Sequence, residues 1–302
     1  MGCRVSGVGV VGYINRRNVI FFVLTIVGAG MVYGPLRDLL GSGARSEYYS
    51  HITLIPLVSI CLIYWERKNL FREAAYSYRM GIILLLFGVL LYLIGTGQKQ
   101  ALSQNDYSGI ITLAGVVFWI GAFTLSYGYR AFRLAIFPLL FLAFMIPIPT
   151  VLMDEVIYLL QVGSTEVTYV LFQVIGVPVS RDGFTFQLPN ISIEVAKQCS
   201  GIRSSLALFI TSFLAAHFFL KTGWRKAVLI LSIIPITIIK NGIRIVTLSW
   251  LAVYVDERFI TGGFLHKSGG FVFYIPALGL LGIILLFLRK TEKRTERRKE
   301  IE

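Results

Sequence analysis

Charged residues are scarce in this chain. Only 15% of its 302 residues are Asp, Glu, Lys or Arg, and 56% are hydrophobic. Soluble domains usually carry about one quarter charged residues. The composition therefore excludes an ordinary soluble domain and indicates an integral membrane protein.

Acidic residues are scarcer still. The chain has 16 Asp and Glu against 29 Lys and Arg, which gives a net charge of +13. Such an excess is typical of proteins that bind nucleic acid. Here the lysines and arginines fall mainly in short segments between apolar runs and in the tail. We therefore attribute the charge to membrane topology and expect no nucleic-acid partner.

Cysteine is also rare, and two further signals are missing. The three cysteines Cys3, Cys61 and Cys199 cannot all pair with one another. No internal repeat of the kind found in transporter halves is visible. The first apolar run is long enough to stay in the bilayer and shows no small-residue cleavage site, so we expect an anchor there and no secretory signal peptide.

Long apolar stretches, by contrast, are abundant. A helix rises about 1.5 Å per residue and bilayer hydrocarbon is roughly 30 Å thick, so about 20 apolar residues cross it. The sequence predicts an all-α polytopic membrane protein, a single integral membrane domain over residues 1–302 with about eight transmembrane helices. The expected spans are 18–36, 51–65, 80–97, 109–127, 132–149, 201–220, 226–254 and 270–288. The second is short, and the polar group KNGIR at 240–244 interrupts the seventh, where we expect a kink or an early end.

Basic residues predict the orientation of these spans. Cytoplasmic connections are enriched in Lys and Arg, and with an even number of spans all the basic segments fall on one side. Both termini are then cytoplasmic, including the basic tail at 289–302. The basic residues in the segments that this orientation places in the cytoplasm, before the tail, are Arg4, Arg16, Arg17, Arg67, Lys68, Arg72, Arg79, Arg130, Arg133, Lys221, Arg225 and Lys226.

The same orientation places the only long connection, residues 150–200, on the outer side. Its first half, 153–176, has too many polar side chains for a lipid-exposed span, and we expect an interfacial or re-entrant helix there. Residues 184–188 and 191–195 alternate apolar and polar side chains around a Pro-Asn turn. This pattern predicts a short β-hairpin that leads directly to Cys199.

Three polar clusters lie at the outer ends of the later spans in this topology. They are KQCSGIRS at 197–204, KNGIRIVTL at 240–248 and FLHKSGGFVF at 264–273. They contain a thiol, Cys199, two arginines, Arg203 and Arg244, and one histidine, His266. Ionisable groups at such places are expensive unless they are paired or functional.

Cysteine, histidine and arginine together are suited to acyl transfer. A thiolate is a nucleophile, and a histidine can accept its proton and later protonate an amine leaving group. An arginine stays charged and can stabilise an oxyanion. Each residue also has an ordinary explanation alone, as a small buried thiol, a headgroup-seeking arginine or an interfacial histidine. Their coincidence on one face of the membrane favours a catalytic site.

These motifs resemble those of the exosortase and archaeosortase family of membrane cysteine transpeptidases. The resemblance rests on EVAKQCSGIR, NGIRI and FLHKSGGFVF in this order and extends over about residues 80–288. It implies that Cys199 is the nucleophile, Arg244 the catalytic arginine that stabilises the oxyanion, and His266 the general acid and base. Many archaeal relatives have arginine at the third position, so the histidine indicates the bacterial exosortase branch.

The resemblance also implies a substrate and a location. Members recognise a C-terminal sorting signal of the PEP-CTERM type, with a Pro-Glu-Pro motif, a transmembrane helix and a basic tail. They cleave near the motif through a Cys thioester and pass the exported protein to a cell-envelope acceptor, alongside exopolysaccharide production. The expected place is the bacterial cytoplasmic (inner) membrane, with the active site at the outer face. The expected partners are membrane-anchored protein substrates, the acceptor and the lipid bilayer, and no cofactor or metal is expected.

Two further residues have supporting roles in this hypothesis. Arg203 lies one turn beyond Cys199, where it pairs with the glutamate of the substrate, holds the thiolate, or forms a structural pair with Glu194 or Asp256. Asn241 orients Arg244.

Two other function classes stay open. In a polytopic transporter or channel the arginines would line an anion path, and Cys199→Ala would keep function while Arg244→Ala would not. A translocation site is expected near the midplane, whereas these polar groups gather at one face. A membrane assembly factor without chemistry would tolerate all three alanine substitutions, but buried arginines are costly without a task.

Overall fold

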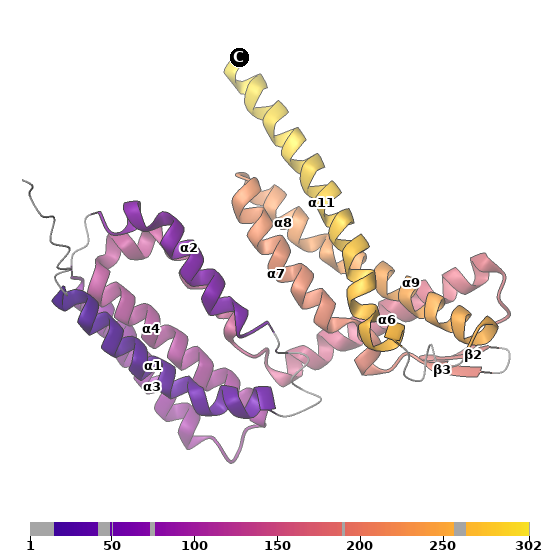
Figure 1. The fold of residues 1–302 in the computed structure, drawn as a ribbon, viewed down its shortest axis with the longest axis horizontal. Helices are drawn as coiled ribbons and strands as arrows, with labels where there is room; N and C mark the ends of the chain where they lie inside the picture. Colours follow the sequence, from indigo (N-terminus) through magenta and orange to yellow (C-terminus); the bar gives the residue numbers. More distant parts are fainter. Residues whose placement is uncertain are drawn as a thin grey trace, which may run out of the picture. The chain divides into compact units, whose positions relative to one another are not determined.

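A computed structural model describes residues 15–41, 49, 51–72, 76–188, 191–256 and 264–301, without the side chains of 39–40, 198–199, 264–271 and 298–301. The chain divides into two compact units, Met1–Thr150 and Val151–Glu302, and each is described by itself (Figure 1).

The first unit is built from helices alone in its described part. Its elements are α1 (Arg16–Gly41), α2 (Leu54–Leu70), α3 (Tyr78–Gly97), α4 (Gln104–Leu134), α5 (Ile136–Phe141) and the 3₁₀ helix η2 (Leu142–Met145). Helices α3 and α4 pack so closely that a Cβ on Gly88 would lie 2.8 Å from the backbone nitrogen of Phe118. Small residues of this kind allow membrane helices to approach one another.

The second unit combines helices with a small sheet (Figure 1). Its elements are α6 (Thr150–Ile175), β1 (Ser180–Asp182), β2 (Thr185–Leu188), β3 (Ile191–Glu194), the 3₁₀ helix η3 (Lys197–Ser200), α7 (Ile202–Phe219), α8 (Gly223–Leu231), α9 (Ile233–Tyr254) and α11 (Phe264–Ile301). Helices α7, α8, α9 and α11 share one apolar core, with Leu208, Leu229, Ile236 and Leu281 among its buried residues.

Six helices of the described chain are long and apolar enough to cross a membrane. They are Arg16–Asp38, Tyr78–Gly97, Gln104–Leu134, Ile202–Phe219, Gly223–Tyr254 and Val272–Arg297. The number is seven if Ile136–Met145 and Thr150–Ile175 form one broken span. The expected all-α polytopic fold is confirmed, and this number is roughly consistent with about eight spans.

Two of the expected spans do not correspond to a helix long enough to be one of the six. The stretch 51–65 corresponds to α2, which has 17 residues. The stretch 132–149 holds the last residues of α4, then α5 and η2, and the helical structure ends at Met145. Pro147 and Pro149 follow, and proline disfavours a helical conformation at the residue before it and cannot donate a helical hydrogen bond.

The expected interruption at residues 240–244 is wrong. Helix α9 runs through them without a break, and the boundary with α8 lies at Ser232. Pro235, in the first turn of α9, has no N–H to offer the carbonyl of Leu231, so the α8 ladder ends there. Proline breaks this span, and the polar residues do not.

The predicted hairpin is present as part of a three-stranded antiparallel sheet in the order β1-β2-β3. Its strands pair Phe186 with Ile193 and Leu188 with Ile191, and the turn at 189–190 lies outside the described residues. The extra strand, β1, was not expected from the sequence. Phe186 and Leu188 are buried in an apolar cluster with Phe172 of α6 and with Ile245 and Val246 of α9.

The helix expected over 153–176 is α6. Its charged side chains, Asp154, Glu155 and Glu166, are exposed. Four of its uncharged polar side chains are buried instead, Gln161, Ser164, Thr165 and Thr168, whereas Gln173 near its end is exposed. The charged side chains of α6 are therefore exposed, and the four buried polar side chains lie where other parts of the protein cover the helix.

Candidate functional site

Cys199 lies in a short turn between the sheet and a membrane helix. Its backbone belongs to η3, and Gly201, two residues later, is the N-cap of α7. Gly201 has φ +76° and ψ +15°, a left-handed conformation that side chains disfavour. The thiol itself lies outside the described part of the structure.

Helix α9 supports this turn from the side. A Cβ built on Gly201 would lie 3.1 Å from the Oδ1 atom of Asn241. Glycine is therefore required twice, by the backbone angle and by the neighbour. The turn after Cys199 thus packs directly against Asn241, one of the two residues that the sequence analysis gave a supporting role.

Asn241 in turn connects α9 to α6. It is fully buried, and its Nδ2 donates a hydrogen bond of 3.0 Å to the Ser164 hydroxyl. One residue on, a Cβ on Gly242 would lie 2.6 Å from the Cγ1 of Val167, so the two helices are in close contact. Three elements, the η3–α7 turn, α6 and α9, therefore converge at Asn241.

Lys240 is a member of the site that the sequence reasoning missed. Its side chain is only 8% exposed, and its Nζ donates to the Ser204 hydroxyl. The Ser204 hydroxyl donates to the Gly201 carbonyl over 2.9 Å, and the Ser205 hydroxyl does so over 2.8 Å. The available signal was the spacing, since Lys240 and Arg244 are four residues apart and share a helix face.

Arg244 and Arg203 lie on the two helices that flank the turn. Arg244 is half-buried on α9, one turn after Asn241. Arg203 is exposed in the first turn of α7, two residues after Gly201. The structure thus brings the Cys199 turn, Asn241 and the helix segments that carry both arginines into one region.

His266 lies in the first turn of α11, and its side chain is outside the described part. Helix α11 packs against α9 and α7, the helices that carry Arg244 and Arg203. The distance from the imidazole to the turn remains a prediction of the sequence motif.

Polar contacts fix the chain on its way into the turn. The Gln161 amide of α6 donates to the Val195 carbonyl, and the Val195 N–H donates to the Phe184 carbonyl over 2.9 Å. Arg181 of β1 forms an ion pair of 2.8 Å with Glu166. This hydrogen bond raises the pKa of Arg181, so its guanidinium stays charged throughout the physiological range.

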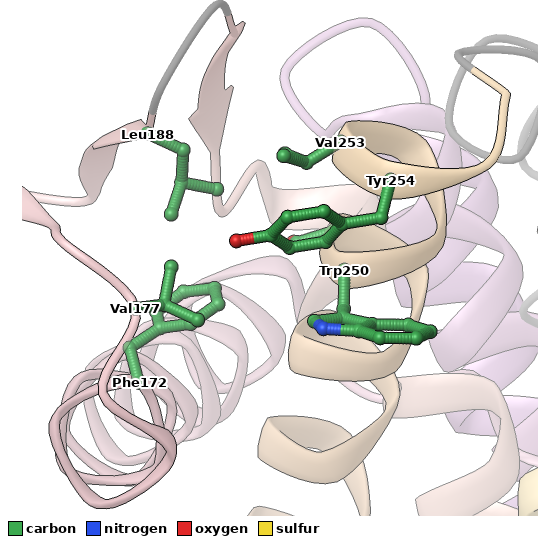
Figure 2. Close-up of a pocket in the computed structure, with 7 residues that line it drawn as sticks. Phe172, Val177, Leu188, Trp250, Val253 and Tyr254 are labelled. Carbon is green, nitrogen blue, oxygen red and sulfur yellow. The ribbon is translucent and has the colours of Figure 1, made fainter.

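An apolar hollow lies one to three turns beyond Arg244 along α9 (Figure 2). Its empty volume is about 160 Å³, part of it open to solvent. It is lined by Phe172, Val177, Leu188, Ser249, Trp250, Val253 and Tyr254. Figure 2 shows the Tyr254 ring reaching from α9 toward Val177 and Leu188. The hollow is too small for more than an apolar side chain or part of a lipid tail.

The chemistry of the described residues is that of a cationic, hydroxyl-rich site. Two basic side chains, Lys240 and Arg244, lie on one face of α9 beside the hydroxyls of the α7 start. In the described residues no three His, Cys, Asp or Glu side chains gather as a metal cluster would require. The arrangement is suited to stabilising negative charge near the turn.

Comparison with known proteins gives one match. A family model described as Transmembrane exosortase (Exosortase_EpsH) matches residues 43–283, which is more than half of the chain. No curated protein and no solved structure matches.

Proposed function

The chain belongs to the transmembrane exosortase family, and from this premise we propose that it is a membrane cysteine transpeptidase with Cys199 as nucleophile. One observation carries the proposal. The turn that contains Cys199 sits on Asn241, one helical turn before Arg244, through a glycine that no other residue can replace without strain. A fixed turn of this kind holds a nucleophile in position for attack.

The proposed reaction has two acyl transfers. The Cys199 thiolate attacks the carbonyl carbon of the scissile peptide bond, and the Arg244 guanidinium stabilises the oxyanion that forms. As the C–N bond breaks, His266 gives a proton to the departing amine, and the new chain end is held as a thioester. An acceptor nucleophile then attacks the thioester, gives its proton back to His266, forms the new bond and releases the thiolate.

The proposed substrate is an exported protein with a C-terminal sorting signal of the PEP-CTERM type. Its transmembrane helix would approach from the bilayer and present the cleavage motif to the turn. The apolar hollow beside Trp250 and Tyr254 would accept one of its side chains. Arg203, exposed at the start of α7, would bind an acidic group of the motif or form a structural pair with Glu194 or Asp256.

The proposed topology puts both chain ends in the cytoplasm and the site at the outer face of the cytoplasmic membrane. Support comes from the distribution of basic residues. The polar connection of α6 and the sheet also comes directly before the turn that carries Cys199.

The test is coexpression with a candidate tripartite substrate. Wild-type protein should convert the substrate to a shorter form, and Cys199→Ala should abolish the conversion. Cys199→Ser should lower it strongly, because a hydroxyl is much less acidic than a thiol and is a weaker nucleophile at neutral pH. Cys61→Ala is the matched control, since Cys61 is exposed on α2 and has no role in the proposal.

Undiminished conversion by Cys199→Ala would overturn the proposal and favour the transporter or the assembly factor. Trapping a substrate adduct on Cys199 at low acceptor concentration would show the thioester directly. A cleaved product without transfer would indicate that water replaces the acceptor.

A further inference from the structure

Lys240 is a buried cation whose surroundings differ from those of an ordinary structural lysine. Its side chain is 8% exposed, and its bonded partner is the Ser204 hydroxyl. Among the residues that the structure describes, no carboxylate lies within ion-pair distance of its ammonium group. A buried ammonium is expensive without a compensating negative charge. An apolar side chain would fill the place of Lys240 at a lower energetic cost, so packing alone does not explain a lysine there.

Hydrogen bonds connect this charge to the nucleophile turn. Lys240 donates to Ser204, and Ser204 donates to the Gly201 carbonyl over 2.9 Å. Gly201 follows Cys199 by two residues. The chain from the ammonium group to the turn has two hydrogen bonds, both pointing toward the turn, so the positive charge polarises the backbone that carries the thiol.

The other charged groups of this region give no nearby negative charge on α7 or α9. The charged groups on the elements that meet here are Arg203 on α7, Arg244 on α9, Lys197 on η3, Glu194 on β3, Asp154, Glu155 and Glu166 on α6, and His266 and Lys267 at the start of α11. Of the acids, Glu166 pairs with Arg181 and Asp154 lies 3.5 Å from Lys197. Two of these four acids therefore already pair with a basic side chain of their own, and neither pairs with Lys240.

We propose that Lys240 is a positioning residue for Cys199: through Ser204 it holds the nucleophile turn, and its charge favours the thiolate over the thiol. This inference rests on the proposed function in taking Cys199 as the nucleophile. The two cations of α9 then have different roles. Arg244 stabilises the oxyanion that forms on the substrate, and Lys240 stabilises the Cys199 thiolate. A positive charge near a thiol is a general means of lowering its pKa.

The experiment measures the pH dependence of Cys199 alkylation and needs no substrate. Full-length protein in detergent, with Cys3→Ser and Cys61→Ser, has Cys199 as its one thiol and is reacted with iodoacetamide between pH 5 and pH 10. Lys240→Gln removes the charge but keeps a donor for Ser204. It should move the midpoint of the alkylation profile upward by about one pH unit. Lys240→Arg should keep the midpoint of the parent protein.

Lys221→Met is the matched control, because the Lys221 side chain, just before α8, is 81% exposed and pairs with Glu296 of α11. It should leave the profile unchanged. A folded Lys240→Gln protein with an unchanged midpoint would overturn the inference. If Lys240→Gln does not fold, Lys240→Met gives the same reading, since a neutral apolar side chain has no charge to bury.

The outcomes separate this inference from the proposed function. A shifted midpoint in a protein that processes no substrate would support the role of Lys240 and contradict the transpeptidase proposal. Normal substrate processing with an unchanged alkylation midpoint would support the transpeptidase proposal and contradict the role of Lys240. A purely structural role for Lys240 would lower thermal stability and leave the midpoint in place.

Discussion

The second unit holds two buried cations, and their partners differ. Arg225, at the start of α8, is 6% exposed and lies 3.5 Å from the equally buried carboxylate of Glu292 on α11. Lys240, in the middle of α9, has a hydroxyl partner instead. The first charge has an acid beside it, whereas the second has no carboxylate within ion-pair distance among the residues that the structure describes. The comparison thus sets an ion pair within the fold against the cation that we propose acts on Cys199.

Glu292 makes several hydrogen bonds besides its ion pair with Arg225. Its carboxylate accepts the Thr222 N–H over 2.7 Å, the Lys221 N–H over 3.1 Å and the Thr222 hydroxyl. Arg225 also donates to the Thr295 hydroxyl over 3.0 Å. The carboxylate thus caps the N-terminus of α8 and neutralises a buried guanidinium at once. These contacts attach the C-terminal part of α11 to the α7–α8 connection.

The largest expected effect is on the ion pair of Arg225. Glu292→Ala removes the cap and leaves Arg225 buried without its acid, so the free energy of unfolding should fall by about 3 kcal/mol. Denaturant titration in detergent micelles measures it. The double variant Arg225→Met with Glu292→Leu should recover much of the loss, because it removes both charges. If Glu292→Ala is as stable as the parent protein, the division between the two cations is wrong.

The next effect concerns Arg244 and should appear in activity alone. Arg244→Lys keeps the charge but loses the planar donor pair, so substrate conversion should fall about a hundredfold, in line with the loss of one oxyanion donor. The unfolding midpoint should stay within the error of the parent protein. Arg203→Lys, on the exposed side of α7, is the comparison. An equal loss in both variants would contradict a special role for Arg244.

The smallest expected effect tests the seat of the nucleophile turn. Gly201→Ala combines a positive φ with a contact of 3.1 Å to Asn241, and should cost about 1–2 kcal/mol of stability together with a loss of activity. Gly176→Ala is the matched control, since Gly176 has φ +78° and no atom within 4 Å of its Cβ position. Gly176→Ala should therefore show only the cost of a side chain at a positive φ, without a steric contact. Equal effects in both variants would mean that Asn241 does not support the turn.

The helical spans were predictable because hydropathy is a local property. Stretches such as 80–97 and 201–220 correspond to α3 and α7 almost to the residue. The breaks were harder to place. The residues KNGIR look like an interruption in sequence, but Lys240 and Asn241 find partners on α7 and α6, so the helix has no reason to end.

The site was predictable in type but not in assembly. The motifs indicated Cys199, Arg244 and His266, and the proximity of the Cys199 turn to α9 agrees with that hypothesis. The roles of these side chains stay predictions. The part of Lys240 could not be predicted from one sequence, because a lysine in an apolar run has the same hydropathy whether it reaches the headgroups or meets a buried hydroxyl.

The sequence by itself determined the membrane class, the approximate spans and the residue types of the candidate site, since these follow from composition and from spacing along the chain. Only the tertiary structure decided which polar groups in the spans meet. Gly201 against Asn241, Lys240 with Ser204, and Arg225 with Glu292 join residues 36 to 67 positions apart. Such contacts depend on how helices pack, and helix packing is a property of the pair of surfaces that local sequence does not specify.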